Sequence, residues 1–259
     1  MLKGLYTAYT GMINEQNRMD IMTNNLANAN TVGFKKEGST SQAFDDVLAL
    51  KIKDTSESPN CAKRLGTMSM GVKIGENYTD YGQGSLRETG NTYDLAIAGN
   101  GFFAIEFTNK AGETTTKYTR DGSFTLNSEG YLVTEDGDYV LDEDGDRIEL
   151  DPLKDSVIDA AGNVYQDDSV VATVGITDFE DYNYLEKYGE NMYQTVDGAT
   201  EQDASAQIRS GYLEMANVQV VNEMVNMISI TRAYETNQKI IQTYDGSLDI
   251  AVNQLGKLR

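Results

Sequence analysis

The chain contains no tryptophan and no histidine, a single cysteine and only two prolines. Histidine is the commonest general base and metal ligand near neutral pH, so its absence disfavours a catalytic or metal centre. Cys61 alone can form neither an intrachain disulfide nor a cysteine-based zinc site. We therefore expect that the protein is not an enzyme, that it has no catalytic residues, and that it binds no metal and no cofactor.

Long apolar runs are also missing. Nothing approaches the stretch of about 18 apolar residues that a membrane-spanning helix needs. Residues 1–30 hold several polar side chains and no uninterrupted apolar core of the kind found in cleaved secretion signals. The sequence predicts no membrane insertion and a cytoplasmic location, unless a different export route handles the chain.

Acidic residues outnumber basic ones, and the formal net charge is −20. The excess lies in the middle of the chain, because residues 54–210 hold 11 basic and 31 acidic side chains. Residues 1–53 and 211–259 are almost neutral. Such a charge argues against nucleic-acid binding, which needs cations facing phosphates. Two nearly neutral ends suit close packing against copies of the same chain.

Both ends carry apolar residues at intervals of seven. Near the N-terminus these are Leu5, Met12, Met19 and Leu26. The spacing predicts one amphipathic helix of about 25 residues with a coiled-coil-like period, ending near residues 28–33, where asparagine and glycine favour a break.

A second series runs from about Tyr212 to the C-terminus and also predicts a helix. Its members are Val220, Met227, Tyr234, Ile241, Leu248 and Leu255. The neighbouring series is polar in its middle, where Gln238 and Asp245 could face other subunits or a hydrated lumen; it comprises Met224, Thr231, Gln238, Asp245 and Val252. An isolated two-stranded coil would therefore be poor here.

The middle of the chain alternates short β-branched or aromatic runs with turn residues. Runs at 94–98, 102–107, 123–126, 131–134 and 139–141 are separated by Asx-Gly or Glu-Gly pairs that indicate hairpins. Such spacing predicts an antiparallel barrel or sandwich. The polar stretch 53–71 is typical of a flexible loop.

The expected fold is α+β, with long N- and C-terminal helices packing as a coiled coil and a central antiparallel all-β domain. We divide the chain into residues 1–52 (helix and extended connector), 53–92 (loop and strands), 93–210 (β-rich outer domain) and 211–259 (C-terminal helix). Helices with matching stripes can pair although they are far apart in sequence.

Three segments suggest chemistry but favour simpler interpretations. Residues 99–104 have the outline of a dinucleotide-binding turn, yet they join two expected strands, whereas that motif opens a helix. Asp142, Asp144 and Asp146 suggest a calcium loop, but the loop pattern lacks its final glutamate, so an acidic hairpin tip is preferred. Asp94 and Asp121 are interpreted as turn or capping residues.

Three segments together resemble the rod and hook proteins of the bacterial flagellum. Residues 24–28 (Asn-Asn-Leu-Ala-Asn) with Phe34 resemble the N-terminal signature of that family. Residues 94–103 and 118–124 resemble its central β-domain, and residues 217–239 its C-terminal helix. The length and the single β-domain resemble the proximal and distal rod proteins more than the longer hook protein, and the choice between those two rod types stays open.

The resemblance implies a structural subunit whose terminal helices form an inner tube, with the β-domain outside. The implied partners are copies of the chain, other rod and hook axial proteins, and the flagellar export apparatus; the implied location is the basal body, reached without a cleaved signal peptide. The expected polymerisation interface comprises Leu5, Met12, Met19, Asn24, Asn25, Leu26, Asn28, Phe34, Val220, Met227, Tyr234, Ile241, Leu248 and Leu255. The alternative is a cell-surface adhesin or stalk with a β head and a coiled-coil stem, which would need a secretion signal or an anchor.

Overall fold

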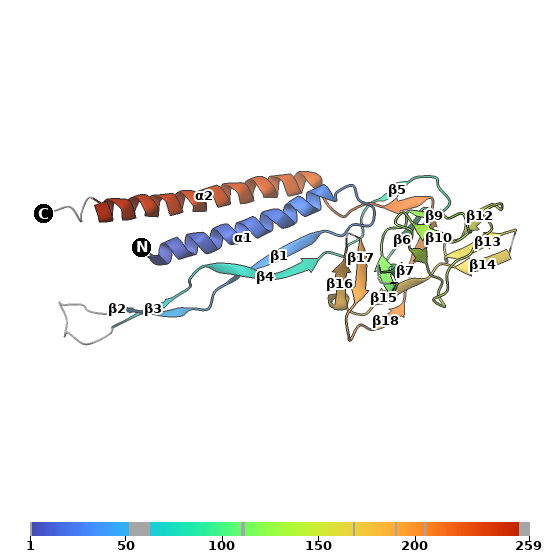
Figure 1. The fold of residues 1–259 in the computed structure, drawn as a ribbon, viewed down its shortest axis with the longest axis horizontal. Helices are drawn as coiled ribbons and strands as arrows, with labels where there is room; N and C mark the ends of the chain where they lie inside the picture. The colour runs from blue at the N-terminus through green and yellow to red at the C-terminus, as the bar shows by residue number, and fades with distance from the viewer. Residues whose placement is uncertain are drawn as a thin grey trace. The chain divides into compact units, whose positions relative to one another are not determined.

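The computed structural model describes residues 2–51, 63–109, 112–167, 169–189, 191–204 and 206–253 (Figure 1). The chain divides into two compact units. The helical unit comprises residues 1–26, 37–80 and 219–259, and the β unit comprises residues 27–36 and 81–218. The predicted division of the chain into four segments assigns each segment a role in the subunit, and it stays a prediction.

The helical unit contains two long helices and a two-stranded antiparallel ribbon (Figure 1). Its elements are α1 (Leu2–Ala27), β1 (Glu37–Ala43), β2 (Val47–Lys51), β3 (Lys63–Met68), β4 (Val72–Thr79) and α2 (Val220–Asn253). β1 pairs with β4, and β2 pairs with β3. The ribbon therefore starts directly after the connection that follows α1.

α1 confirms the predicted N-terminal helix in both length and end point. No proline interrupts residues 2–27, and the helix stops at Ala27, where Asn28 accepts a backbone hydrogen bond from Thr31 at 3.1 Å. The chain turns next at Gly33, which has a φ of +70°. A side chain at Gly33 would lie 2.5 Å from the backbone nitrogen of Asp121, so the turn needs glycine both for its conformation and for space.

The β unit is built from short antiparallel strands. They are β5 (Leu86–Glu88), β6 (Leu95–Ala98), β7 (Phe102–Thr108), β8 (Thr114–Thr119), β9 (Phe124–Leu126), β10 (Leu132–Thr134), β11 (Tyr139–Val140), β12 (Ser156–Ile158), β13 (Asn163–Gln166), β14 (Ser169–Thr173), β15 (Ile176–Phe179), β16 (Leu185–Tyr188), β17 (Met192–Thr195), β18 (Glu201–Asp203), β19 (Gln207–Ser210) and β20 (Tyr212–Glu214). One turn of 3₁₀ helix (Tyr182–Tyr184) precedes β16.

The described strands of the β unit form four sheets. The largest has the order β16-β17-β8-β7-β11-β10-β9, with β15 joined to β7 and β18 joined to β15. β12-β13-β14 form a separate sheet, and β6–β19 and β5–β20 are pairs. Two buried apolar clusters fill the unit, one around Phe103, Leu132 and Val164, the other around Phe102 and Tyr193.

Hairpins form at three of the predicted turns and not at two others. Gly130, Gly137 and Gly145 all have positive φ, and each lies in a turn that connects two paired segments. The Asn100-Gly101 pair connects β6 to β7, which lie in different sheets, because β6 pairs with β19 instead. The Asp121-Gly122 pair likewise connects β8 and β9, which do not pair with each other. Long-range pairing outweighs the local turn signal at both places.

Two segment predictions need correction. The C-terminal helix starts at Val220 and not near Tyr212, because residues 212–214 are β20, held by hydrogen bonds to β5. The predicted loop 53–71 contains a strand, β3, which pairs with β2. The rest of that loop up to residue 62, including Pro59 and Cys61, lies outside the described residues.

Candidate assembly interface

α1 and α2 run antiparallel and contact each other within the helical unit (Figure 1). A side chain at Gly4 would collide with the hydroxyl of Tyr244, and one at Gly11 would lie 3.1 Å from the side-chain nitrogen of Asn237. Further along, the hydroxyl of Thr231 lies 3.9 Å from the sulfur of Met19. The numbers rise on α1 as they fall on α2, so the two ends of the chain lie side by side.

The face of α2 that is covered within the chain follows steps of three and four residues. Its buried or half-buried members are Glu223, Met227, Ile230, Tyr234, Asn237, Ile241, Tyr244, Leu248 and Ala251. Alternating steps of three and four keep one stripe on one side of a helix. Four predicted residues of the seven-residue series belong to this covered stripe: Met227, Tyr234, Ile241 and Leu248.

The neighbouring series of Met224, Thr231, Gln238, Asp245 and Val252 does not complete the covered stripe. Met224, Gln238, Asp245 and Val252 are exposed, and only Thr231 is half-buried. The positions one residue earlier, such as Ile230, Asn237 and Tyr244, are covered instead. The glycines of α1 leave room there for the side chains of Asn237 and Tyr244.

A second face of α1 is tied to the ribbon by amide side chains. Asn25 is fully buried; its side-chain nitrogen donates to the carbonyl of Glu37 at 2.7 Å, and its oxygen accepts from the Glu37 N–H at 2.9 Å. Asn14 and Ser41 are joined by hydrogen bonds of 3.0 and 3.2 Å. These contacts set where the ribbon leaves the helix.

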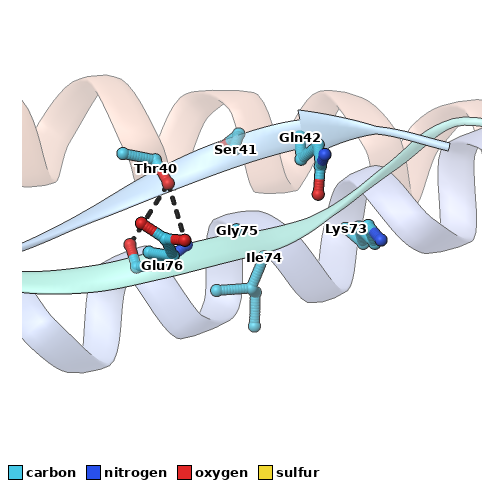
Figure 2. A pocket seen from close by; sticks show the side chains of 7 residues that line it. All are labelled: Thr40, Ser41, Gln42, Lys73, Ile74, Gly75 and Glu76. Atoms are coloured by element: carbon cyan, nitrogen blue, oxygen red, sulfur yellow. Dashed lines mark hydrogen bonds between the residues drawn. The ribbon is translucent and has the colours of Figure 1, made fainter.

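A hollow beside the ribbon marks an irregularity in its pairing (Figure 2). The register of β1 against β4 shifts between Ser39 and Ser41. At this shift the hydroxyl of Thr40 takes the place of a backbone group in the strand pairing. It accepts a hydrogen bond from the N–H of Glu76 at 2.9 Å and donates one to the carbonyl of Glu76 at 3.2 Å. The hollow is therefore explained by a bulge.

Apolar side chains also lie on the outside of both helices. On α2, Val221, Met224, Val225 and Ile228 are 51–73% exposed and are spaced as i, i+3, i+4 and i+7. We call these four residues the outer α2 stripe. On α1, Tyr6, Tyr9 and Ile13 are exposed at the same kind of spacing. The sequence prediction placed Met224 in the neighbouring series but did not identify either set as one face of a helix, although their spacing alone marks one.

In the β unit, a buried ion network lies on the two segments that connect to the helices. Lys35 donates to one oxygen of the Glu214 carboxylate at 2.7 Å, and Arg120 donates to the other at 3.2 Å. All three side chains are at most 3% exposed. The N–H of Gly84 adds a third hydrogen bond to this carboxylate at 2.8 Å, so Glu214 holds together three distant parts of the chain.

The same connecting segments are joined by a second polar bridge. The side chain of Asn217 accepts from the N–H of Lys36 at 2.7 Å and donates to the carbonyl of Gly82 at 3.1 Å. Lys35 donates to that same carbonyl at 3.0 Å. Phe34 lies in the sequence between the end of α1 and these contacts. Its side chain is buried, and the ammonium of Lys187 lies 4.5 Å from the centre of its ring.

The predicted interface residues differ widely in exposure. Asn25 and Phe34 are buried, and Asn24 and Val220 are exposed. Leu255 lies outside the described residues. The remaining nine are half-buried: Leu5, Met12, Met19, Leu26, Asn28, Met227, Tyr234, Ile241 and Leu248.

Within the described ranges, no group of three or more acidic, cysteine or histidine side chains is arranged to hold a metal ion. Among those residues, no helix combines the length and apolarity needed to cross a membrane. The Asp142–Asp146 segment forms a tight turn between bridged residues Leu141 and Arg147.

Comparison with known families matches three parts of the chain. Residues 5–35 match the family described as flagella basal body rod protein, and residues 96–166 match the D1 domain of the flagellar hook protein FlgE/F/G family. Residues 209–255 match the C-terminal region of the flagellar basal body rod FlgEFG proteins. The first match includes most of α1, and the last includes the whole of α2.

Curated relatives align with this chain from end to end. The flagellar basal-body rod protein FlgF of Caulobacter vibrioides is 37% identical over 265 residues, covering 100% of both chains. The rod protein FlgG of Bacillus subtilis is 35% identical, covering 98% of this chain and 99% of its own. The hook-basal body complex protein FlhO of Bacillus subtilis is 31% identical over the full length of both. Full-length identity at this level shows that the chain belongs to the family of flagellar basal-body rod proteins.

Proposed function

We propose that this chain is a structural subunit of the flagellar basal-body rod that polymerises through its terminal helices. In this proposal the polymer is a helical tube that transmits torque and forms part of the export channel. Family membership supports the role of rod subunit. The observation that carries the polymerisation proposal is the outer α2 stripe, an apolar face on a helix whose opposite face is already covered by the chain itself.

The two faces of α2 have different roles in this account. The covered stripe around Met227, Tyr234 and Ile241 packs α2 against α1 in a coiled-coil manner, which makes one stiff unit of the two ends. The outer α2 stripe then meets neighbouring copies. The residues predicted from sequence remain part of the proposed interface, with Asn25 and Phe34 acting indirectly, because both side chains are buried within the chain.

Energetic magnitudes favour a polymer over a dimer. Complete burial of the four side chains of the stripe would contribute at most roughly 6–12 kcal/mol, at about 1.5–3 kcal/mol each. Joining two free copies costs roughly 4–15 kcal/mol in lost freedom and ordering. One contact is therefore marginal, whereas a copy added at a growing tip contacts several neighbours at once.

The symmetry of the contact points the same way. A stripe on α2 that meets a different surface of the next copy is a heterologous interface, which generates an open helix when the rotation does not close. The proposed partners are copies of this chain, other rod and hook axial proteins at the ends of the segment, and the flagellar export apparatus that delivers the subunit. The proposed location is the flagellar basal body, reached without a cleaved signal peptide.

Aspartate substitutions at two exposed positions of α2 test the proposal. Val225→Asp places a charge on the outer α2 stripe without touching the covered face, so we expect a folded subunit that does not assemble into rods and cells that do not swim. Gln242→Asp adds the same charge at an exposed polar position of the same helix and should assemble. The measurement is electron microscopy of isolated basal bodies, with circular dichroism of each purified variant as the folding control.

Normal rods built from the Val225→Asp subunit would remove the outer α2 stripe from the interface. If neither variant assembles into rods, α2 tolerates no added charge at either position. That result would also contradict the assignment of the interface to the outer α2 stripe.

A further inference from the structure

The sheet β12-β13-β14 has one covered face and one open face. Ile158 and Val164 are buried in the larger apolar cluster of the β unit. On the other face, Val157 lies opposite Tyr165, and Tyr165 lies opposite Val170. Residues directly opposite each other in neighbouring antiparallel strands point to the same side. A continuous apolar row therefore crosses all three strands on the open face.

A bulge on β14 adds a fourth member to this row. The register passes from Tyr165–Val170 to Val164–Ala172, which leaves Val171 as an extra residue. Such a bulge turns an additional side chain toward one face. Val157, Val170 and Val171 are 64%, 53% and 46% exposed, and Tyr165 is half-buried. We call Val157, Tyr165, Val170 and Val171 the valine row.

Polar residues are expected at such positions. An antiparallel sheet with one solvated face normally alternates apolar residues inward with polar residues outward. In β8 of the same unit the exposed residues are polar: Thr114, Thr115 and Thr116 are all threonine. The valine row breaks the rule across three neighbouring strands, and contiguous exposed apolar surface of this kind marks interaction sites.

The surroundings of the valine row are strongly acidic. Residues 151–173 contain five aspartates and one basic residue, Lys154. The ammonium of Lys154 is already paired with Asp167 at 2.8 Å. Asp155 directly precedes β12, Asp167 directly follows β13, and both side chains are exposed.

This charge decides between possible occupants. The same sheet of a second copy would bring another acidic surface, since residues 54–210 hold 31 acidic and 11 basic side chains, and like charges facing each other oppose binding. An anionic lipid surface is disfavoured for the same reason. A protein with an apolar strip bordered by lysine or arginine is complementary in both respects.

We propose that the valine row is a docking surface for a different protein, one that presents an apolar strip with a basic rim. The surface belongs to the β unit and uses none of the residues through which the helices are proposed to polymerise. The proposal can therefore fail while rod assembly stands, and the reverse is also true.

Site-specific photocross-linking in cells that carry the chain tests this. p-Benzoylphenylalanine is introduced separately at Val157, at Val170 and, as a matched exposed control, at Thr115. We expect positions 157 and 170 to give an adduct with one and the same foreign protein, whose cross-linked peptide lies beside lysine or arginine residues. Position 115 should give no such adduct. Mass spectrometry of the adducts identifies the peptides.

Charge and shape are then tested on the Val170 cross-linker. Asp155→Lys should reduce the yield of the adduct, whereas Glu113→Lys, the same change at an exposed site beside the control position, should leave it unchanged. Val157→Thr with Val171→Thr should abolish the adduct while keeping the melting temperature, because threonine suits an exposed strand position.

The proposal is overturned by an adduct between two copies of this chain, by the absence of any adduct at positions 157 and 170, or by an equal adduct at position 115. A foreign partner whose cross-linked surface lacks basic residues would overturn it as well.

Discussion

Glu214 is the residue on which the connections of the β unit converge. Its carboxylate accepts hydrogen bonds from Lys35, Arg120 and the backbone of Gly84, all within 3.2 Å and away from solvent. A carboxylate buried with two cations is costly to disturb, because removing it leaves positive charge in a poorly solvated place. No sequence pattern predicted that Lys35, Arg120 and Glu214 are buried together, since charged side chains are by default assigned to the surface.

Glu214→Gln should therefore destabilise the β unit strongly. The amide keeps the size of the side chain but lacks the charge, and losing one partner of a buried ion pair costs about 3–5 kcal/mol. Glu106→Gln is the matched control, because Glu106 binds Arg147 bidentately at the surface at 2.7 and 2.8 Å. Chemical denaturation of both variants should give a much larger loss for Glu214→Gln; equal losses would contradict the role given to the network.

Tyr182 should make the β unit sensitive to alkali. Burial, and then its hydrogen bond to Asp178, raise the pKa of Tyr182 from 10.0 to about 12. A tyrosine whose pKa is raised on folding supports the folded state fully below the unfolded value and progressively less as pH rises through the folded value. We therefore expect the free energy of unfolding to fall between about pH 10 and 12.

Tyr182→Phe should reduce this alkaline loss without changing its direction, because burial also raises the pKa of Tyr118. The measurement is chemical denaturation at pH 9 and at pH 11. An identical alkaline loss in the wild type and in Tyr182→Phe would show that Tyr182 does not titrate as described.

At the scale of elements, the N-terminal helix and several strands could be predicted from sequence. An unbroken stretch without proline, ended by Asn28 and Gly33, leaves little choice for α1. The β-branched and aromatic runs located β6, β7, β9, β10 and β11, and the turn residues located the local hairpins β9–β10 and β10–β11. The β6–β19 and β5–β20 pairings are not local, and no sequence pattern announces which distant strand completes a pair.

The stripe on α2 shows a different limit of sequence patterns. Apolar residues at intervals of seven found half of the covered face, through Met227 and Tyr234. The other half contains Asn237 and Tyr244, which hydrophobicity does not mark and which meet the glycines of α1. The outer α2 stripe was detectable from its i, i+3, i+4 and i+7 spacing. The prediction instead followed the seven-residue series that runs along the whole helix.

Alanine substitutions of helix glycines test the contact between α1 and α2. In an open helix position, glycine to alanine raises stability by about 0.5–1 kcal/mol. Gly246→Ala should show this gain, because a side chain there meets nothing within 4 Å. Gly4→Ala should be less stable than Gly246→Ala, since its methyl group collides with Tyr244.

Thermal unfolding followed by far-UV circular dichroism compares these two variants. Equal gains in melting temperature would mean that the helices are not in contact at Gly4.

At the scale of the whole molecule, the chain has two kinds of surface. The nearly neutral ends hold apolar faces on both α1 and α2, whereas the acidic excess lies between them in sequence. This separation suits a subunit whose ends pack against copies of itself and whose β unit meets solvent or other proteins. Family membership was predictable from the short motifs around residues 24–28, 94–103 and 217–239.

Electron cryomicroscopy of basal bodies that contain this subunit tests the central claim most directly. The account predicts that Val221, Met224, Val225 and Ile228 are buried between neighbouring copies of the chain, with the face of α2 around Met227 and Tyr234 still packed on α1. A map in which those four residues line solvent, or in which the copies meet only through their β units, would contradict it.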